Sequence, residues 1–404
     1  MNKLLNMFSF TLADLFMGIQ YLFVAAGATI LVPILTGIPA SVAFFTAGVG
    51  TLIFHFVTKG KVPVLLSSSF AFIAPIIVVS EMYGYPYAFG GIVFAGLVYL
   101  LLALVIKVVG IEKVLMFFPT TVTSTMVILI GLILAPIAIQ NASTNWVVAL
   151  ITLGVGVTVK SIHEKSILGS FSILFAILIG TLVSIPAGLF DFSAVASANL
   201  VGLPAFSLPQ FSIAAITIIA PIAIVTFLEH FADISAVSKV VEEDFLEDPG
   251  VHRTLLGDGL ATAFAGLVGG IPNTTYSENV GALEMTGVKK PVTLRITAIL
   301  LILLSFFPFL AFSIHSIPAA VIGGISILLF GMIAGSGIKS LVLENVDMHD
   351  YRNMIIVSSM LVVGVGGAII DVAGLQVSSL ALAAVLGIVL NLFFQRKEIF
   401  SIYK

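Results

Sequence analysis

The sequence contains no cysteine and very little charge. Only 9% of its 404 residues are Asp, Glu, Lys or Arg, and one residue is tryptophan. Without cysteine the chain has no disulfide bonds, thiolate metal sites or cysteine nucleophiles. Soluble domains carry roughly 25% charged residues, so this chain has too few to cover a surface that faces water.

Apolar residues dominate instead. They make up 59% of the chain, and only a lipid bilayer solvates so much apolar surface, which predicts a polytopic integral membrane protein. The net charge is −3 and no basic tract is present. Phosphate backbones are bound by clustered Lys and Arg, so nucleic acid is excluded as a partner.

Apolar runs separated by polar breaks predict an all-α protein with fourteen transmembrane segments. The segments are expected at 11–35, 39–58, 62–80, 86–106, 115–139, 145–159, 167–189, 209–236, 254–270, 273–288, 293–314, 317–337, 353–371 and 376–395. The third and the tenth are the most polar, because they contain a run of three serines (67–69) and the sequence Pro-Asn-Thr-Thr (272–275).

The positions of Lys and Arg support this number. If the N-terminus is cytoplasmic and all fourteen segments cross, the 17 basic residues all lie on the cytoplasmic side, as the positive-inside rule requires. Omitting either doubtful segment alone would place later basic clusters outside. We therefore expect a multi-pass protein of the inner (plasma) membrane with both termini in the cytoplasm.

The longest outer loop, 190–208, divides the segments into two sets of seven. An odd number per half forces the halves into opposite orientations, as in transporters built from inverted repeats. Such proteins bind substrate near the midplane, where interrupted segments of the two halves meet. Here the interrupted segment is the third of each half. The alternative is two locally polar helices packed inside a bundle.

Most Asp and Glu residues lie in loops or near the ends of predicted segments, and four do not: Glu229, Asp233, Asp258 and Glu278. A carboxylate at bilayer depth costs about 2.5–3.5 kcal/mol on insertion scales, so it usually faces a functional cavity. Glu229 and Asp233 are four residues apart and share a helix face. One of two such neighbours should hold a proton near neutral pH, which is the minimum requirement for proton coupling. The alternative for Asp233 is a structural cap or ion pair nearer the cytoplasm.

His230 follows Glu229 and points about 100° around the helix from it. A single histidine there is more often a hydrogen-bonding residue in helix packing than a ligand. No other His lies at ligand spacing, so neither a metal nor a cofactor is expected. No Ser-His-Asp, phosphate-loop or HExxH pattern is present, and an enzyme is therefore disfavoured.

The two interrupted segments have similar local patterns. Pro272 disfavours helix at Ile271, and the Thr and Tyr residues that follow favour a short strand. Ser277 or Asn279 can cap the helix that follows, whose N-terminus would present free N–H groups. The first half has a proline at 63, three serines and Phe70 in the same order. Two short strands that meet at the midplane would expose backbone groups to a planar ligand, with Phe70 or Tyr276 stacking on it.

These residues resemble the nucleobase–ascorbate transporter family. The run 278–287, ENVGALEMTG, matches the signature of that family. Further blocks resemble its bacterial uracil permeases: 27–33 (GATILVP), 68–72 (SSFAF), 248–253 (DPGVHR) and 272–276 (PNTTY). The blocks occur in both halves and in the same order, so the resemblance covers essentially the whole chain.

The resemblance implies fourteen segments in two inverted repeats, with a core domain (1–110 and 208–315) and a gate domain (111–207 and 316–404). It implies a homodimer that imports a nucleobase with a proton. By motif position Glu229 and Glu278 would hydrogen-bond the base, Phe70 and Ser277 would offer backbone contacts, and Tyr276 lies beside them. Glu229, Asp233 and Asp258 are the expected proton-coupling residues.

Which nucleobase is carried stays open, because Asp233 and Asp258 depart from the pattern of the uracil permeases. Asp233 and Asp258 resemble residues of purine carriers, whereas Glu278 is the residue typical of uracil carriers. Because position 278 contacts the base in the family, uracil is favoured over xanthine or urate. A passive channel or facilitator is an alternative of another class, although one asymmetric acidic cluster is unlike the charged rings of channels.

Overall fold

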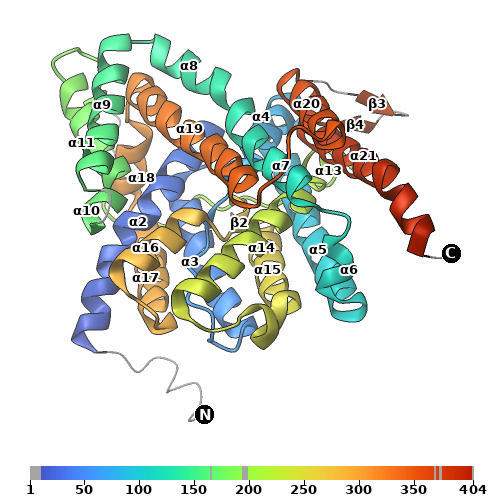
Figure 1. Ribbon diagram of the computed structural model, residues 1–404. Helices are drawn as coiled ribbons and strands as arrows, with labels where there is room; N and C mark the ends of the chain where they lie inside the picture. Colours follow the sequence, from blue (N-terminus) through green and yellow to red (C-terminus); the bar gives the residue numbers. More distant parts are fainter. Residues whose placement is uncertain (1–10, 164–165, 193–198, 368–369, 373–374, 403–404) are drawn as a thin grey trace.

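The computed structural model describes residues 11–163, 166–192, 199–367, 370–372 and 375–402. Helices account for most of this part, together with two pairs of very short strands, and the pair at 370–372 and 375–377 lies at the edge of the molecule (Figure 1). The predicted outer loop 190–208 and both predicted cytoplasmic termini lie partly outside the described residues.

In the first half, the elements are α2 (Leu12–Thr36), α3 (Ala40–Val57), β1 (Ser67–Ser68), η1 (Phe70–Phe72), α4 (Ile73–Tyr83), α5 (Tyr85–Val109), α6 (Ile111–Leu115), α7 (Thr120–Ile133), α8 (Ala135–Ser143), α9 (Trp146–Ile162), α10 (Ile167–Ser170) and α11 (Ser172–Ser184). In the second half, they are α13 (Ile213–Ile219), α14 (Ile222–Val241), η2 (Leu246–Gly250), α15 (Val251–Leu267), β2 (Asn273–Thr274), α16 (Ser277–Thr286), α17 (Pro291–Ser305), α18 (Pro308–His315), α19 (Ala319–Leu343), α20 (Tyr351–Val365), β3 (Ile370–Val372), β4 (Leu375–Val377) and α21 (Ser379–Ile402).

Six helical segments are long and apolar enough to cross a bilayer, counted within the described residues. The pair α17–α18 makes a seventh if it forms one span, and five shorter apolar helices accompany them. The protein is therefore a helical integral membrane protein, as expected. The count of fourteen segments stays a prediction.

The strands expected in the third and tenth segments are confirmed. β1 and β2 pair antiparallel, with Ser67 opposite Thr274 and Ser68 opposite Asn273. The N–H of Ser69 also donates to the carbonyl of Pro272 at 3.0 Å. Each strand leads into a short helix, β1 into η1 and α4, and β2 into α16. In each half the predicted break is therefore a short strand followed by a helix. The paired strands β1 and β2, with the first turns of η1 and α16, are called the strand–helix joint here.

Several details of the helices differ from the prediction. The segment 293–314 is not one helix, because α17 and α18 meet at a bend of 86°. Pro308 supplies no N–H and forces Phe307 out of the helical region, with φ −111° and ψ 88°. The thirteenth helix ends at Val365 rather than at 371, and the hairpin β3–β4 follows it. Tyr276, and neither Ser277 nor Asn279, occupies the N-cap position of α16.

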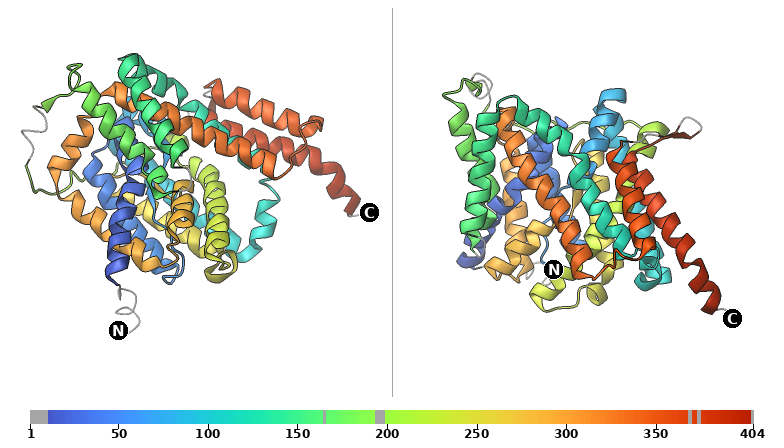
Figure 2. Two further views of the ribbon diagram at one scale, coloured as in Figure 1. Left: turned by 60° about the vertical axis from the view of Figure 1, so that its left-hand side comes forward. Right: turned by 45° about the horizontal axis from the view of Figure 1, so that its top comes forward.

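The helices pack in two sets, which Figure 2 shows from two further directions. α15 packs against α5 and α3, and α17 packs against α3 and α2. α19 packs against α7, α8, α9 and α11, and α20 packs against α21 and α7. Gly96 and Gly259 allow the backbones of α5 and α15 to approach closely, because a Cβ on Gly96 would lie 2.7 Å from the carbonyl oxygen of Gly259.

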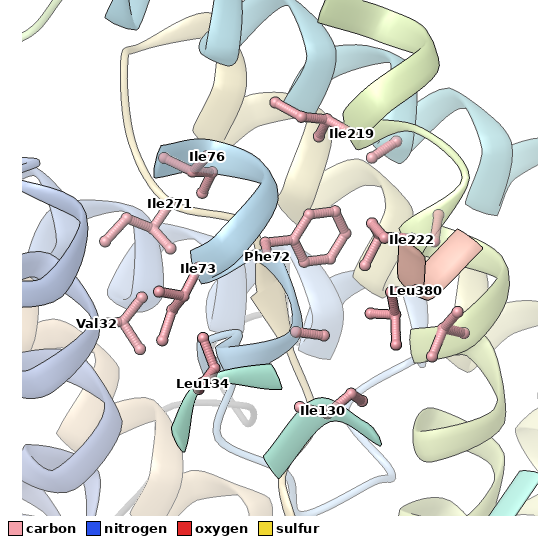
Figure 3. Packing of buried hydrophobic residues seen from close by; sticks show 14 of the residues in the cluster. Val32, Phe72, Ile73, Ile76, Ile130, Leu134, Ile219, Ile222, Ile271 and Leu380 are labelled. Atoms are coloured by element: carbon pink, nitrogen blue, oxygen red, sulfur yellow. The ribbon is translucent and has the colours of Figure 1, made fainter. Parts of the chain in front are cut away.

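The first turn of α4 joins the two sets of helices. Figure 3 shows Ile73 beside Val32 of α2, whereas Phe72 faces Ile222 of α14 and Leu380 of α21. All of these side chains belong to one buried apolar cluster. Apolar packing therefore fixes α4, and with it the end of β1, between the two sets.

Candidate functional site

A cavity of about 220 Å³ lies beside the strand–helix joint and is called the polar cavity here. One wall carries Val24 of α2, Phe70 of η1, Glu229 of α14 and Tyr276 at the start of α16. The opposite wall comes from the other set of helices. It is lined by Ile130, Lys160, Gly169, Ser172, Ile173, Leu329, Met332, Ile333 and Ser336, with Gly281 and Met285 of α16 completing the lining.

Three of the predicted binding residues therefore share one cavity: Glu229, Phe70 and Tyr276. Ser277 and Glu278 form the start of α16 directly after Tyr276, but their side chains lie outside the described part of the structure. The backbone at Tyr276 is extended, with φ −150° and ψ 146°. The extended chain therefore ends at Tyr276 and the first turn of α16 follows directly. The free N–H groups of that turn favour a ligand atom with partial negative charge.

The strands next to the cavity are held by side chains of α3 and α15. Thr262 of α15 donates to the carbonyl of Asn273 at 2.8 Å. The amide of Asn273 donates to the carbonyl of Thr46 at 3.0 Å. The N–H of Leu66 donates to the hydroxyl of Thr51 at 2.9 Å. Two-residue strands carry little stability of their own, so these bonds set the position of the joint.

The other two predicted proton-coupling residues lie deeper. Asp233 is 4% exposed and Asp258 is fully buried, and neither lines the polar cavity. His230 Nδ1 lies 2.8 Å from Oδ2 of Asp258, and its Nε2 lies 2.9 Å from Oγ1 of Thr254. His230 therefore ties α14 to α15, which is the helix-packing role favoured from the sequence. In the described part of the chain no cluster of potential metal ligands occurs.

Sequence reasoning missed the wall on the far side of the cavity. Lys160, Ser172 and Ser336 are polar groups on α9, α11 and α19 that line it. These helices are otherwise apolar and carry no interruption, and Lys160 was counted only as a cytoplasmic charge. Its neighbours along the chain give no signal that it faces a cavity, because that depends on how the two sets of helices pack.

A second cavity, of about 190 Å³, lies next to the polar one and is almost entirely apolar. It is called the apolar cavity here. Phe70 and Ile130 line both cavities, so these two side chains form the wall between them. The ring of Phe70 is also edge-on to that of Phe330 on α19, with centroids 6.4 Å apart. The remaining lining residues of the apolar cavity are Ala71, Ala74, Pro75, Val78, Ile133, Leu134, Ile218, Gly367, Ser378, Ser379 and Leu380.

Solved structures show which class of protein has this fold. The transmembrane domain of a cyanobacterial bicarbonate transporter, BicA, matches with a TM-score of 0.63 at 18% identity, covering 94% of this chain and 96% of that one. The murine solute carrier 26 family member A9, an anion transporter solved in the inward-facing state, matches with a TM-score of 0.75 at 10% identity. That match covers 96% of this chain and 69% of the other. The chain therefore has a membrane-transporter fold.

Sequence comparison then gives the family. Residues 12–373 match the model of a permease family. A probable uracil permease of Haemophilus influenzae is 40% identical over 392 residues, covering 95% of this chain and 94% of the relative. The uracil permease of Bacillus subtilis is 39% identical, with 94% and 92% covered, and that of Escherichia coli is 36% identical, with 94% and 90% covered. The chain belongs to this permease family, and the resemblance to nucleobase–ascorbate transporters is confirmed.

Proposed function

We propose that this protein is a secondary active transporter that imports uracil together with a proton by alternating access. The observation that carries the proposal is the position of Glu229, Phe70 and Tyr276 in one cavity beside the paired strands. Uracil is planar and alternates N–H and C=O groups. A carboxylate accepts from N–H groups, peptide N–H groups donate to C=O groups, and an aromatic ring stacks on the plane. The relatives named uracil permeases favour this base over xanthine or urate.

We assign the binding residues as Glu229, Glu278, Phe70, Ser277 and Tyr276. Glu229 lines the cavity, and Glu278 is the second residue of α16, the helix that follows Tyr276. Glu229, Asp233 and Asp258 are assigned to proton coupling, because all three are carboxylates within or against the membrane-spanning helices.

The proposed architecture has fourteen segments in two inverted repeats of seven. This number is reached by adding the six long helical segments, the bent pair and the five shorter apolar helices to the more polar helices α15 and α16. The core domain would be 1–110 and 208–315, and the gate domain 111–207 and 316–404. The polar cavity supports this division, because its two walls come from these two parts.

The proposed orientation places both termini in the cytoplasm of the inner (plasma) membrane, as the distribution of Lys and Arg requires. Lys160, on the cytoplasmic side in this orientation, lines the polar cavity. The polar cavity would then open towards the cytoplasm, and the apolar cavity would lie on the outer side of Phe70 and Ile130. A homodimer is proposed from the family resemblance alone.

Uptake into proteoliposomes tests the function. With an acidic exterior, labelled uracil should accumulate saturably, and a protonophore should abolish the accumulation. An excess of unlabelled xanthine, urate or hypoxanthine should compete poorly. Uptake that is insensitive to the protonophore would contradict proton symport, strong competition by xanthine would indicate the purine alternative, and large unitary currents in electrophysiology would indicate a channel.

A further inference from the structure

The segment 62–66 leads from the turn after α3 into β1 and is buried. Its valines and leucines are at most 1% exposed, and buried backbone N–H and C=O groups need hydrogen-bond partners. Two side chains of α3 supply such partners. Thr51 accepts from the N–H of Leu66 at 2.9 Å, and Nε2 of His55 lies 2.8 Å from the carbonyl oxygen of Val64. The two side chains are one helical turn apart, so one face of α3 holds the backbone that enters β1.

The hydrogen bonds of His55 define its protonation state. Nε of Arg295 on α17 donates to Nδ1 of His55 at 3.2 Å. A guanidinium group can only donate, so Nδ1 carries no hydrogen and accepts. On the other side of the ring, Nε2 faces the carbonyl of Val64, which can only accept. Nε2 therefore carries the hydrogen, and His55 is a neutral ring that accepts on one side and donates on the other.

The end of α3 is itself held by two arginines from neighbouring helices. Arg295 is 5% exposed, and its Nη2 donates to the carbonyl of Gly60 at 3.0 Å. Arg253 of α15 donates to the carbonyl of Val57, the last residue of α3, at 3.0 Å. α15 and α17 therefore both fix the end of α3 and the turn after it, and His55 connects this fixed end to the segment 62–66.

The segment 62–66 leads directly into one wall of the polar cavity. β1 follows it and pairs with β2, and Phe70, two residues after β1, lines the cavity. A shift of the segment would move β1 along β2 or separate the two strands, and either change would displace Phe70 relative to Glu229. His55 is not among the residues that line the cavity. It can act on a ligand there only through the backbone of the segment.

We propose that His55 is a positioning residue of the uracil site, which fixes β1 and Phe70 through the carbonyl of Val64, and that Arg295 orients His55 by fixing its tautomer. This inference rests on the proposed binding of uracil in the polar cavity, and it adds two residues that lie outside that cavity. A role in packing alone would make each replacement of His55 act through stability. The positioning role makes the affinity for uracil depend on the hydrogen bond from Nε2.

His55→Gln and His55→Asn separate these roles, because each retains one hydrogen bond of the ring. The nitrogen of glutamine reaches the position of Nε2 and can donate to Val64, but it no longer accepts from Arg295. The oxygen of asparagine can accept from Arg295, but its amide is too short to reach Val64. His55→Gln should therefore bind labelled uracil like the wild type although its melting temperature falls further. His55→Asn should bind about two- to tenfold more weakly, as expected for one lost hydrogen bond, with the smaller fall in melting temperature.

Thr36→Val is the control and should match the wild type in affinity. Thr36 is also buried, and among the described residues its hydroxyl bonds only to carbonyls of its own helix. Affinities that follow the melting temperatures of the two His55 variants would overturn the inference. Equal affinities of the two variants, whether lowered or unchanged, would overturn it as well.

Hydrogen exchange keeps the inference testable if His55→Gln fails to fold. The N–H groups of Leu66 and Ser69 are hydrogen-bonded at the two ends of β1. They should exchange faster in His55→Asn than in Thr36→Val, and equal exchange would overturn the inference. A wild-type protein that does not bind uracil would contradict the proposed function itself, whereas the exchange rates would still decide whether His55 fixes the strand.

Discussion

At the scale of single residues, the sequence was enough to select the carboxylates of the candidate site. It did not show which of them line the same cavity. A carboxylate in an apolar run is conspicuous, which is why Glu229, Asp233 and Asp258 could be selected. Residues four apart on a helix differ by about 40° in direction. Because of this difference in direction, Glu229 lines the polar cavity, whereas Asp233 is buried and is not among the residues that line it. The partner of Asp258 lies on another helix, and no local pattern indicates it.

One charge outside the membrane-spanning segments has a defined pH dependence. Asp248, in the turn between α14 and α15, forms an ion pair with Lys61, which precedes β1. The hydrogen bond from Lys61 lowers the pKa of Asp248 below its usual value of 3.8. The carboxylate is therefore favoured in the folded state. The stabilisation is complete above the pKa of the unfolded chain and is lost as the pH falls through the folded pKa.

We expect Asp248→Asn to lower the melting temperature in detergent by at most about 2 °C at pH 7, because both partners are exposed to water and screened. The difference from the wild type should shrink in high salt and vanish as the pH falls through the lowered pKa of Asp248. Glu247→Gln is the control, since Glu247 makes no ion pair within the described residues. A difference that grows on acidification would contradict the assigned pair.

At the scale of secondary structure, proline and small hydroxyl residues were the most informative signals. They located β1 and β2 and the helices that follow them, because proline removes a backbone donor and disfavours helix at the residue before it. The same signal at Pro308 was overlooked, and the predicted helix 293–314 is bent there. The hairpin β3–β4 follows a helix that ends earlier than expected. Hydrophobicity alone does not fix where an apolar helix ends.

The wall formed by Phe70 of η1 and Ile130 of α7 should control access to the polar cavity. Because the chain contains no cysteine, single cysteines can be introduced without background. With a membrane-impermeant thiol reagent outside, Val78→Cys in the apolar cavity should react much faster than Ser336→Cys in the polar cavity. In inside-out vesicles the order should reverse.

Adding Ile130→Ala to Ser336→Cys should increase labelling from outside, because the change removes one side of the wall. Gly335→Cys, on the same helix at an open position, controls for the reactivity of α19 itself. Equal labelling of Val78→Cys and Ser336→Cys from the outer side in the absence of uracil would contradict the closed wall.

At the scale of the whole molecule, composition and the distribution of charge were enough to predict a polytopic membrane protein. The two interrupted segments and the carboxylates within apolar runs then indicated a transporter. The resemblance to one permease family extended that prediction to the whole chain. The polar cavity lies where the two sets of helices meet, and its far wall, with Lys160, Ser172 and Ser336, comes from helices with no distinguishing pattern. Their contribution follows from the packing of α7, α9, α11 and α19, which involves residues far apart in the sequence.

The most direct test of the account is equilibrium binding of labelled uracil to the purified wild-type protein and to Glu229→Gln. A hydrogen bond to a charged group contributes about 1.5–3 kcal/mol, so the variant should bind about 10- to 150-fold more weakly at unchanged melting temperature. Thr36→Val should bind like the wild type. Equal affinity of the wild type and Glu229→Gln would contradict the assignment of the polar cavity as the uracil site.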